Sequence, residues 1–116
     1  MSKDEAAVEA EIQAKGLTAP RLTPDDIEQT IVGEYAFTLD KATEGAPQLP
    51  GMASFTIVAL VLRNGFIVTG ESAPASPANF DAALGHKIAR ENAKKKIWQL
   101  EGYLLRTRLA DAPPQA

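Results

Sequence analysis

The side chains best suited to chemistry in this 116-residue chain are cationic and gather near its C-terminal end. Residues 84–109 contain seven basic and two acidic residues, a net charge of +5, whereas residues 1–53 contain ten acidic and four basic residues, a net charge of −6. Arginine and lysine bind phosphate through charge-assisted hydrogen bonds. An acidic chain with one basic end indicates a local anion site, and it disfavours a nucleic-acid-binding surface spread over the molecule.

Two further side chains have groups that recognise a nucleotide base: the ring of Phe80 can stack on it, and the amide of Asn92 can hydrogen-bond its edge. The candidate ligand-binding residues are Arg63, Phe80, Lys87, Arg90, Asn92, Lys96, Arg106 and Arg108. Simpler interpretations stand beside this one. Phe80 would equally serve as a core residue with Trp98, Asn92 as a surface residue, and lysines 94–96 as a solvated helix face near a C-terminus.

The sequence predicts neither catalysis nor metal binding. His86 is the only histidine, the chain has no cysteine, and no carboxylate stands at metal-ligand spacing from His86. Ser72 lies near Glu71 but lacks the Gly-x-Ser-x-Gly context of a nucleophile, and no acid is placed to orient the imidazole. We therefore expect no enzyme and no cofactor.

Arg63 must be positioned by the two apolar segments that meet at Asn64-Gly65. Residues 55–63 and 66–70 have strand composition, and Asn-Gly favours a two-residue type I′ turn. Such a turn places Arg63 opposite Phe66 and Leu62 opposite Ile67. Both faces of this hairpin are largely apolar, so both should be covered.

Most of the other candidates belong to a helix that we expect to begin at Ser76-Pro77, run to Leu100 and stop at Gly102. Two apolar sides are predicted for it, one formed by Phe80, Leu84, Ile88 and Trp98 and the other by Gly85, Ala89 and Ala93. The first side is expected to enter the core. The second is a ridge of small residues, which we expect to pack against a neighbouring subunit.

The remaining segments complete an α+β fold. Alternation in Tyr103–Leu109 predicts a third strand, and residues 1–35 predict one or two helices, the second beginning at Thr23-Pro24 and continuing through Tyr35. Residues 36–53 are expected to form a long loop and residues 110–116 a disordered tail. The expected architecture is a single domain over residues 1–116, with a hairpin and a third strand packed on a long helix and with residues 54–109 as its centre.

The chain contains no apolar run of membrane-spanning length, so we expect a soluble protein that does not contact a membrane. A gapped pattern links the hairpin to the helix: Asn64-Gly65-Phe66, Val68-Thr69-Gly70-Glu71-Ser72-Ala73, Ser76-Pro77, Asn79-Phe80-Asp81, Gly85, Lys87-Ile88-Ala89, Asn92-Ala93, Lys96-Ile97-Trp98, Leu100, Gly102-Tyr103 and Leu105. Over residues 55–109 this pattern resembles a family of small phage-encoded proteins that includes the Thoeris anti-defence sponges, which sequester the nucleotide signal made by bacterial TIR-domain enzymes. Pro74 stands where members of that family often have cysteine.

The resemblance implies a phage anti-defence protein in the host-cell cytoplasm. It implies a non-enzymatic homodimer or a hexamer built as a trimer of dimers, with pockets at subunit interfaces. Those pockets would bind glycocyclic ADP-ribose or cyclic di- and trinucleotides and sequester them without cleavage. Two other hypotheses remain open: a nucleic-acid-binding phage regulator that uses the basic residues, and a host-protein-binding regulator that uses the acidic N-terminal half.

Overall fold

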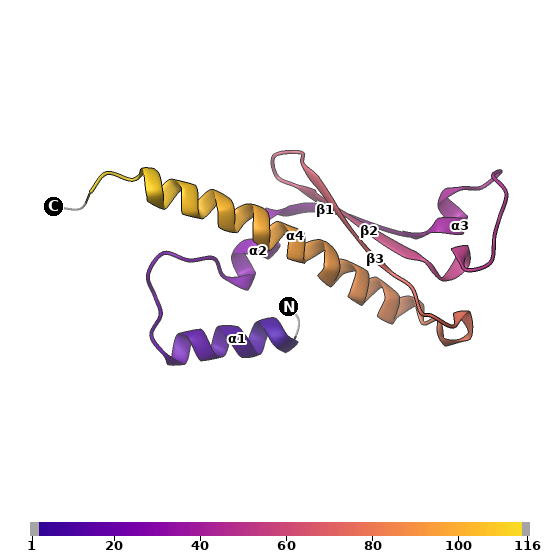
Figure 1. Ribbon diagram of the computed structural model, residues 1–116, viewed down its shortest axis with the longest axis horizontal. Helices are drawn as coiled ribbons and strands as arrows, with labels where there is room; N and C mark the ends of the chain where they lie inside the picture. Colours follow the sequence, from indigo (N-terminus) through magenta and orange to yellow (C-terminus); the bar gives the residue numbers. More distant parts are fainter. Residues whose placement is uncertain (1–2, 115–116) are drawn as a thin grey trace.

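The computed structural model describes residues 3–114, in which a three-stranded sheet packs on one long helix (Figure 1). Its helices and strands are α1 (Lys3–Ala14), α2 (Pro24–Thr30), β1 (Ile31–Thr38), α3 (Leu39–Ala42), β2 (Thr56–Leu62), β3 (Ile67–Ser72) and α4 (Ala82–Asp111), with short 3₁₀ turns η1 (Met52–Ser54) and η2 (Pro77–Asn79). The sheet is antiparallel in the order β1-β2-β3. The predicted α+β class is confirmed.

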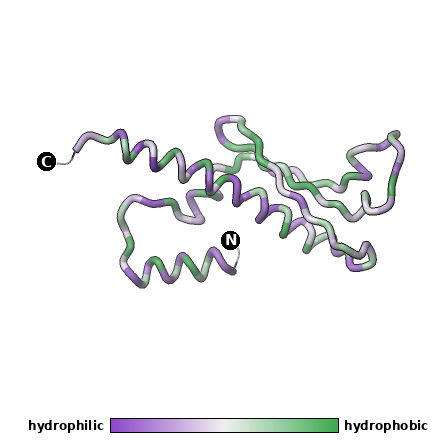
Figure 2. The backbone as a smooth tube through the Cα atoms, viewed as in Figure 1, coloured by the Kyte–Doolittle hydropathy of each residue, from purple (hydrophilic) through white to green (hydrophobic). Residues whose placement is uncertain are grey.

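The core lies between one face of the sheet and α4. Strand β2 alternates strictly between buried and half-buried residues, as a strand covered on one face should. The buried apolar residues are Ile27 from α2, Val58, Leu60 and Leu62 from β2, Val68 from β3, and Ala89, Ala93 and Ile97 from α4. In Figure 2 hydrophilic and hydrophobic colours alternate along α1 and α4, as expected of helices with one side exposed.

The small-residue side of α4 forms this core, so the predicted roles of the two helix sides were reversed. A side chain at Gly70 would place its Cβ 2.1 Å from the carbonyl oxygen of Ala89, which shows how closely α4 approaches β3. Only small residues on both elements permit that approach. Leu84 and Ile88, which were expected in the core, are instead exposed.

The third strand is β1, and the prediction of a strand over Tyr103–Leu109 was wrong. Helix α4 passes through Gly102 and ends at Asp111, because a glycine in a helix costs only about 1 kcal/mol and the leucines and arginines around it favour helix. Ile31–Thr38 is rich in β-branched and aromatic residues, and it leaves α2 after Thr30 to form a strand.

Three other boundaries also differ from expectation. The predicted loop over residues 36–53 begins with the end of β1 and with α3, so residues 43–51 alone lack helix and strand there. Residues 77–79 form a separate turn, and α4 begins after Asp81, whose side chain accepts a hydrogen bond from the backbone N–H of Leu84 at 2.9 Å. Residues 110–111 of the predicted tail are helical, whereas residues 115–116 lie outside the described residues.

The opposite face of the sheet is not covered by any described element. Its large apolar residues are Tyr35 and Phe37 from β1, Ile57 and Val61 from β2, and Ile67 from β3, a set that we call the open face. The molecule is elongated, with extents of 64 × 30 × 19 Å, because the C-terminal half of α4 projects past the sheet (Figure 1). None of the described helices is both long enough and apolar enough to cross a membrane.

Candidate functional site

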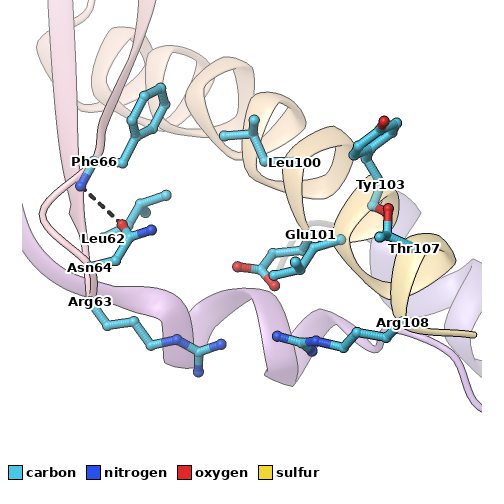
Figure 3. Close-up of a pocket in the computed structure, with 10 residues that line it drawn as sticks. Leu62, Arg63, Asn64, Phe66, Leu100, Glu101, Tyr103, Thr107 and Arg108 are labelled. Carbon is cyan, nitrogen blue, oxygen red and sulfur yellow. Dashed lines mark hydrogen bonds between the residues drawn. The ribbon is translucent and has the colours of Figure 1, made fainter. Parts of the chain in front are cut away.

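A cavity of about 570 Å³ lies between the hairpin tip and the C-terminal half of α4 (Figure 3). We call it the cationic pocket because Arg63 and Arg108 line it from opposite sides. Its volume falls within the range that small-molecule sites occupy in proteins. Leu62, Leu100 and Leu104 contribute apolar lining.

The hairpin loop determines where Arg63 lies. Gly65 donates its backbone N–H to Leu62 O at 2.8 Å, and Leu62 donates to Phe66 O at 2.8 Å, so the loop has three residues instead of the predicted two. Gly65 alone has a positive φ angle in this loop, +89°, as a type I turn followed by a glycine bulge requires. The pairing is therefore shifted by one residue, with Val61 opposite Ile67. Val68 then faces the core, and Ile67 lies on the open face.

The other wall of the pocket is formed by residues 100–108 of α4, and the prediction of a strand over Tyr103–Leu109 covers most of it. Leu100, Leu104 and Arg108 recur every four residues, which places them on one side of a helix. Tyr103 and Thr107 form a neighbouring row, and the Thr107 hydroxyl donates to Tyr103 O at 3.0 Å. A strand over these residues would have separated Leu104 from Arg108 along its length, so the pocket depends on the helix continuing past Gly102.

Neither arginine of the pocket is paired with a carboxylate among residues 3–114. Figure 3 shows the side chains of Arg63 and Arg108 extending toward one another, and neither is in an ion pair within the described chain. Two guanidinium groups that converge on one space favour an anion between them. Phe66 and Tyr103 are 56% and 79% exposed at the rim, and their rings are free to stack on a planar group. The arrangement therefore provides anion binding together with aromatic stacking.

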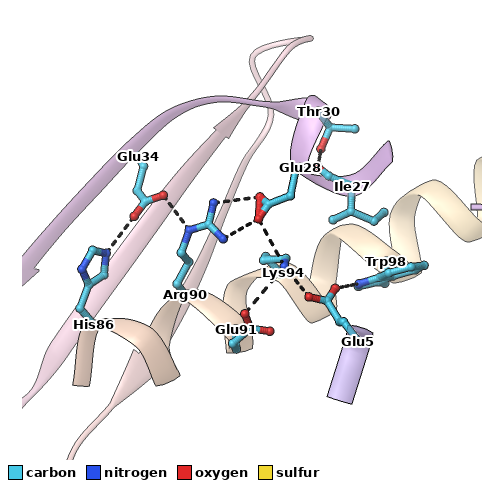
Figure 4. A network of polar contacts seen from close by, with 10 residues as sticks. All are labelled: Glu5, Ile27, Glu28, Thr30, Glu34, His86, Arg90, Glu91, Lys94 and Trp98. Atoms are coloured by element: carbon cyan, nitrogen blue, oxygen red, sulfur yellow. Dashed lines mark hydrogen bonds and ion pairs between the residues drawn. The ribbon is translucent and has the colours of Figure 1, made fainter. Parts of the chain in front are cut away.

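Arg90, another predicted ligand residue, is committed to carboxylates of its own chain (Figure 4). Its guanidinium donates to both carboxylate oxygens of Glu28, at 2.8 and 2.9 Å, and to Glu34 at 2.8 Å. These hydrogen bonds lower the pKa of Glu28 to about 2 and raise the pKa of Arg90 above its ordinary value. Burial acts to raise the pKa of Glu34, but its hydrogen bonds to Arg90 and His86 outweigh burial and lower it.

Lys94 is similarly unavailable to a ligand, since only 1% of its side chain is exposed. Its ammonium group lies 2.7 Å from Glu5 of α1, 3.4 Å from Glu28 and 3.7 Å from Glu91. Desolvation acts to lower the pKa of Lys94, but these carboxylates outweigh it and raise the pKa. Glu5 also accepts a hydrogen bond from the indole of half-buried Trp98 at 3.0 Å, so this cluster attaches α1 to α4.

The other predicted residues are dispersed. Asn92 donates its side-chain amide to Glu71 O of β3 at 3.0 Å and thereby fixes α4 to the sheet. Phe80 is half-buried beside Gly85 at the far end of α4. Lys96 lines an adjoining cavity, which shares Phe66 and Leu100 with the cationic pocket. Lys87 and Arg106 are exposed outside the pockets described above. Of the eight candidates, only Arg63 and Arg108 meet in the cationic pocket.

Sequence reasoning missed Glu101, Phe66 and Tyr103, which also line this pocket. The four-residue recurrence of Leu100, Leu104 and Arg108 was the signal that could have revealed it, provided that the helix was extended through Gly102. Within residues 3–114, no group of three or more histidine, cysteine, aspartate or glutamate residues is arranged to hold a metal ion.

Residues 22–109 match the model of the Phage protein (N4 Gp49/phage Sf6 gene 66) family. The chain belongs to this family. The prediction of a small phage protein family is confirmed at that level. No curated protein and no solved structure matches the chain. The matched residues 22–109 contain the sheet and the pocket-lining part of α4, whereas α1 precedes them.

Proposed function

We propose that this phage protein binds a cyclic nucleotide immune signal in the cationic pocket and sequesters it without cleavage, the ligand being glycocyclic ADP-ribose or a cyclic di- or trinucleotide. The observation that carries the proposal is the pair of arginines that face one another without carboxylate partners. A cyclic nucleotide presents phosphates and planar bases on one rigid scaffold. Its phosphates can accept hydrogen bonds from Arg63 and Arg108, and its bases can stack on Phe66 and Tyr103.

Sequestration without chemistry agrees with the composition of the pocket wall. The Thr107 hydroxyl donates to a backbone carbonyl of its own helix, and His86 bonds Glu34 near the other end of α4. Neither group forms the nucleophile and base pair that hydrolysis would require. The proposed activity therefore rests on affinity, and the bound ligand should be released chemically unchanged.

We further propose that the partner of the protein is a second copy of itself. The ridge on α4 packs against the protein's own sheet, so the proposed contact moves to the open face, where Tyr35, Phe37 and Ile67 expose apolar surface. Apolar patches of this kind on soluble proteins mark contact surfaces. A dimer formed there would cover the one sheet face that the described chain leaves bare.

The test is calorimetric titration of the protein with glycocyclic ADP-ribose and with cyclic di- and trinucleotides. Arg63→Ala and Arg108→Ala should each weaken binding about ten- to a hundredfold, because a charge-assisted hydrogen bond contributes about 1.5 to 3 kcal/mol. Arg106→Ala is the matched control: it removes the same charge from the same helix, but Arg106 does not line the pocket. Its affinity should stay within about twofold of the wild type.

Mass spectrometry of ligand released by heating should return the intact cyclic nucleotide. Recovery of a hydrolysed product would instead show that the protein is an enzyme. Failure of the wild type to bind any compound of the panel, together with salt-sensitive binding of duplex DNA, would replace the proposal with the nucleic-acid-binding regulator.

A further inference from the structure

Within the part of the chain that the structure describes, Glu101 is the one acidic side chain that lines the cationic pocket. It is half-buried on α4, and Figure 3 shows its carboxylate extending from the helix toward the hairpin loop. Among the described residues, Glu101 pairs with neither Arg63 nor Arg108. A half-buried carboxylate that is bonded to neither arginine has acceptor oxygens available for a donor group that enters the pocket.

Arg63, Arg108 and Glu101 together give the pocket a net charge of +1. Each of the three charged groups can hydrogen-bond a ligand. A phosphodiester carries one negative charge, whereas a terminal phosphate carries about 1.5 to 2 at neutral pH. Two diesters can each meet one guanidinium. A terminal phosphate brings surplus negative charge close to Glu101, where the partly desolvated pocket strengthens repulsion. The amine of a base or a ribose hydroxyl, in contrast, can donate to the carboxylate.

We infer that Glu101 determines the ligand class of this pocket. It accepts a hydrogen bond from a base amine or a ribose hydroxyl, and it selects nucleotides whose phosphates are all internal against those that carry a terminal phosphate. This inference rests on the proposed function and narrows it. A cyclic di- or trinucleotide has internal phosphates only and gains a terminal phosphate when one phosphodiester is hydrolysed, so Glu101 distinguishes it from that ring-opened product.

The experiment compares two ligands that differ by one group: the linear dinucleotide adenylyl-adenosine, and the same dinucleotide with a 5′-phosphate. Each competes with a fluorescent cyclic diadenylate for the protein, at low and at high salt. In the wild type the 5′-phosphate should weaken binding. In Glu101→Gln the ratio of the two affinities should shift about five- to tenfold toward the phosphorylated ligand, and the shift should shrink at high salt.

Two further variants control the test. Glu44→Gln removes the same charge from an exposed residue outside the pocket, and it should keep the wild-type ratio. Glu101→Asp keeps the charge and should also discriminate against the 5′-phosphate. An unchanged ratio in Glu101→Gln, or the same loss of discrimination in Glu101→Asp, would overturn the role of Glu101 and leave the proposed function intact. Absence of cyclic diadenylate binding in the wild type, together with absence of binding to the wider panel, would instead contradict the proposed function.

Discussion

The arginines of this protein have opposite roles, and their partners decide which role each one has. Arg90 donates to Glu28 and Glu34 and joins α4 to α2 and β1. Arg63 and Arg108 have no such partners in the described chain and converge on an open cavity. The first role is structural and the second leaves charge available for a ligand. Sequence alone treated these residues as equivalent because the partners of Arg90 lie 56 and 62 residues away from it.

The Glu28–Arg90 pair makes the folding stability depend on pH. The folded pKa of Glu28, about 2, lies below its ordinary value of 4.5, so the pair stabilises the fold above about pH 4.5 and the contribution is lost as pH falls toward 2. Because Glu28 is partly exposed, we expect about 1 to 2 kcal/mol. Urea unfolding at pH 7 and at pH 3 should show a smaller loss of stability in Glu28→Gln than in the wild type.

Glu44→Gln is the control for this measurement, because Glu44 is exposed and outside the described ion pairs. Its unfolding free energy should follow the wild type at both pH values. An equal acid-induced loss in Glu28→Gln and in the wild type would mean that the pair contributes nothing to stability.

At the scale of elements, close contact between β3 and α4 fixes the position of the helix. The Cβ that an alanine would add at Gly70 falls 2.1 Å from Ala89 O and 2.4 Å from Ala93 N, and both are backbone atoms that cannot rotate away. Asn92 adds a hydrogen bond from the same part of the helix to Glu71 O. Together these contacts hold the first half of α4, and the rigid continuation of the helix carries Arg108 to the pocket.

Gly70→Ala and Gly102→Ala should therefore have opposite effects. The first should destabilise the fold by about 3 kcal/mol, because the helix must move to admit a methyl group. The second should stabilise it by about 0.5 to 1 kcal/mol, because a Cβ at Gly102 meets no atom within 4 Å and alanine favours helix. Urea unfolding measures both. Destabilisation by Gly102→Ala would show that the helix needs a glycine there.

The elements that the sequence predicted well were those with strong local signals. The β2–β3 hairpin, the start of α2 at Thr23-Pro24 and the existence of a long helix all follow from turn residues, caps and apolar periodicity. The errors occurred where a local signal was overridden. Gly102 predicts a helix stop, but it lies inside α4, and the residues after it, predicted as a strand, complete the helix. That error concealed the pocket, because Arg108 reaches it only from a helix.

At the scale of the whole molecule, one face of the sheet is buried and the other is bare. The two sides of α4 have the same asymmetry: its small residues meet the sheet, whereas Leu84 and Ile88 are exposed. Sequence could identify both sides as apolar but could not decide which one entered the core, because that choice depends on how closely β3 approaches. An elongated chain with this much exposed apolar surface favours association.

A charge on the open face should therefore break the assembly without unfolding the chain. Ile67 is 54% exposed there, so Ile67→Lys should convert an oligomer to a monomer, because the lysine would have to be desolvated in the contact. Leu17→Lys is the matched control, since Leu17 is 57% exposed in the segment after α1, outside the sheet. Light scattering should give an oligomer for the wild type and for Leu17→Lys, and a monomer for Ile67→Lys with an unchanged circular dichroism spectrum. A monomeric wild type would rule out self-association, whereas an Ile67→Lys variant that stays oligomeric would move the contact to the exposed side of α4, where Leu84→Lys repeats the test.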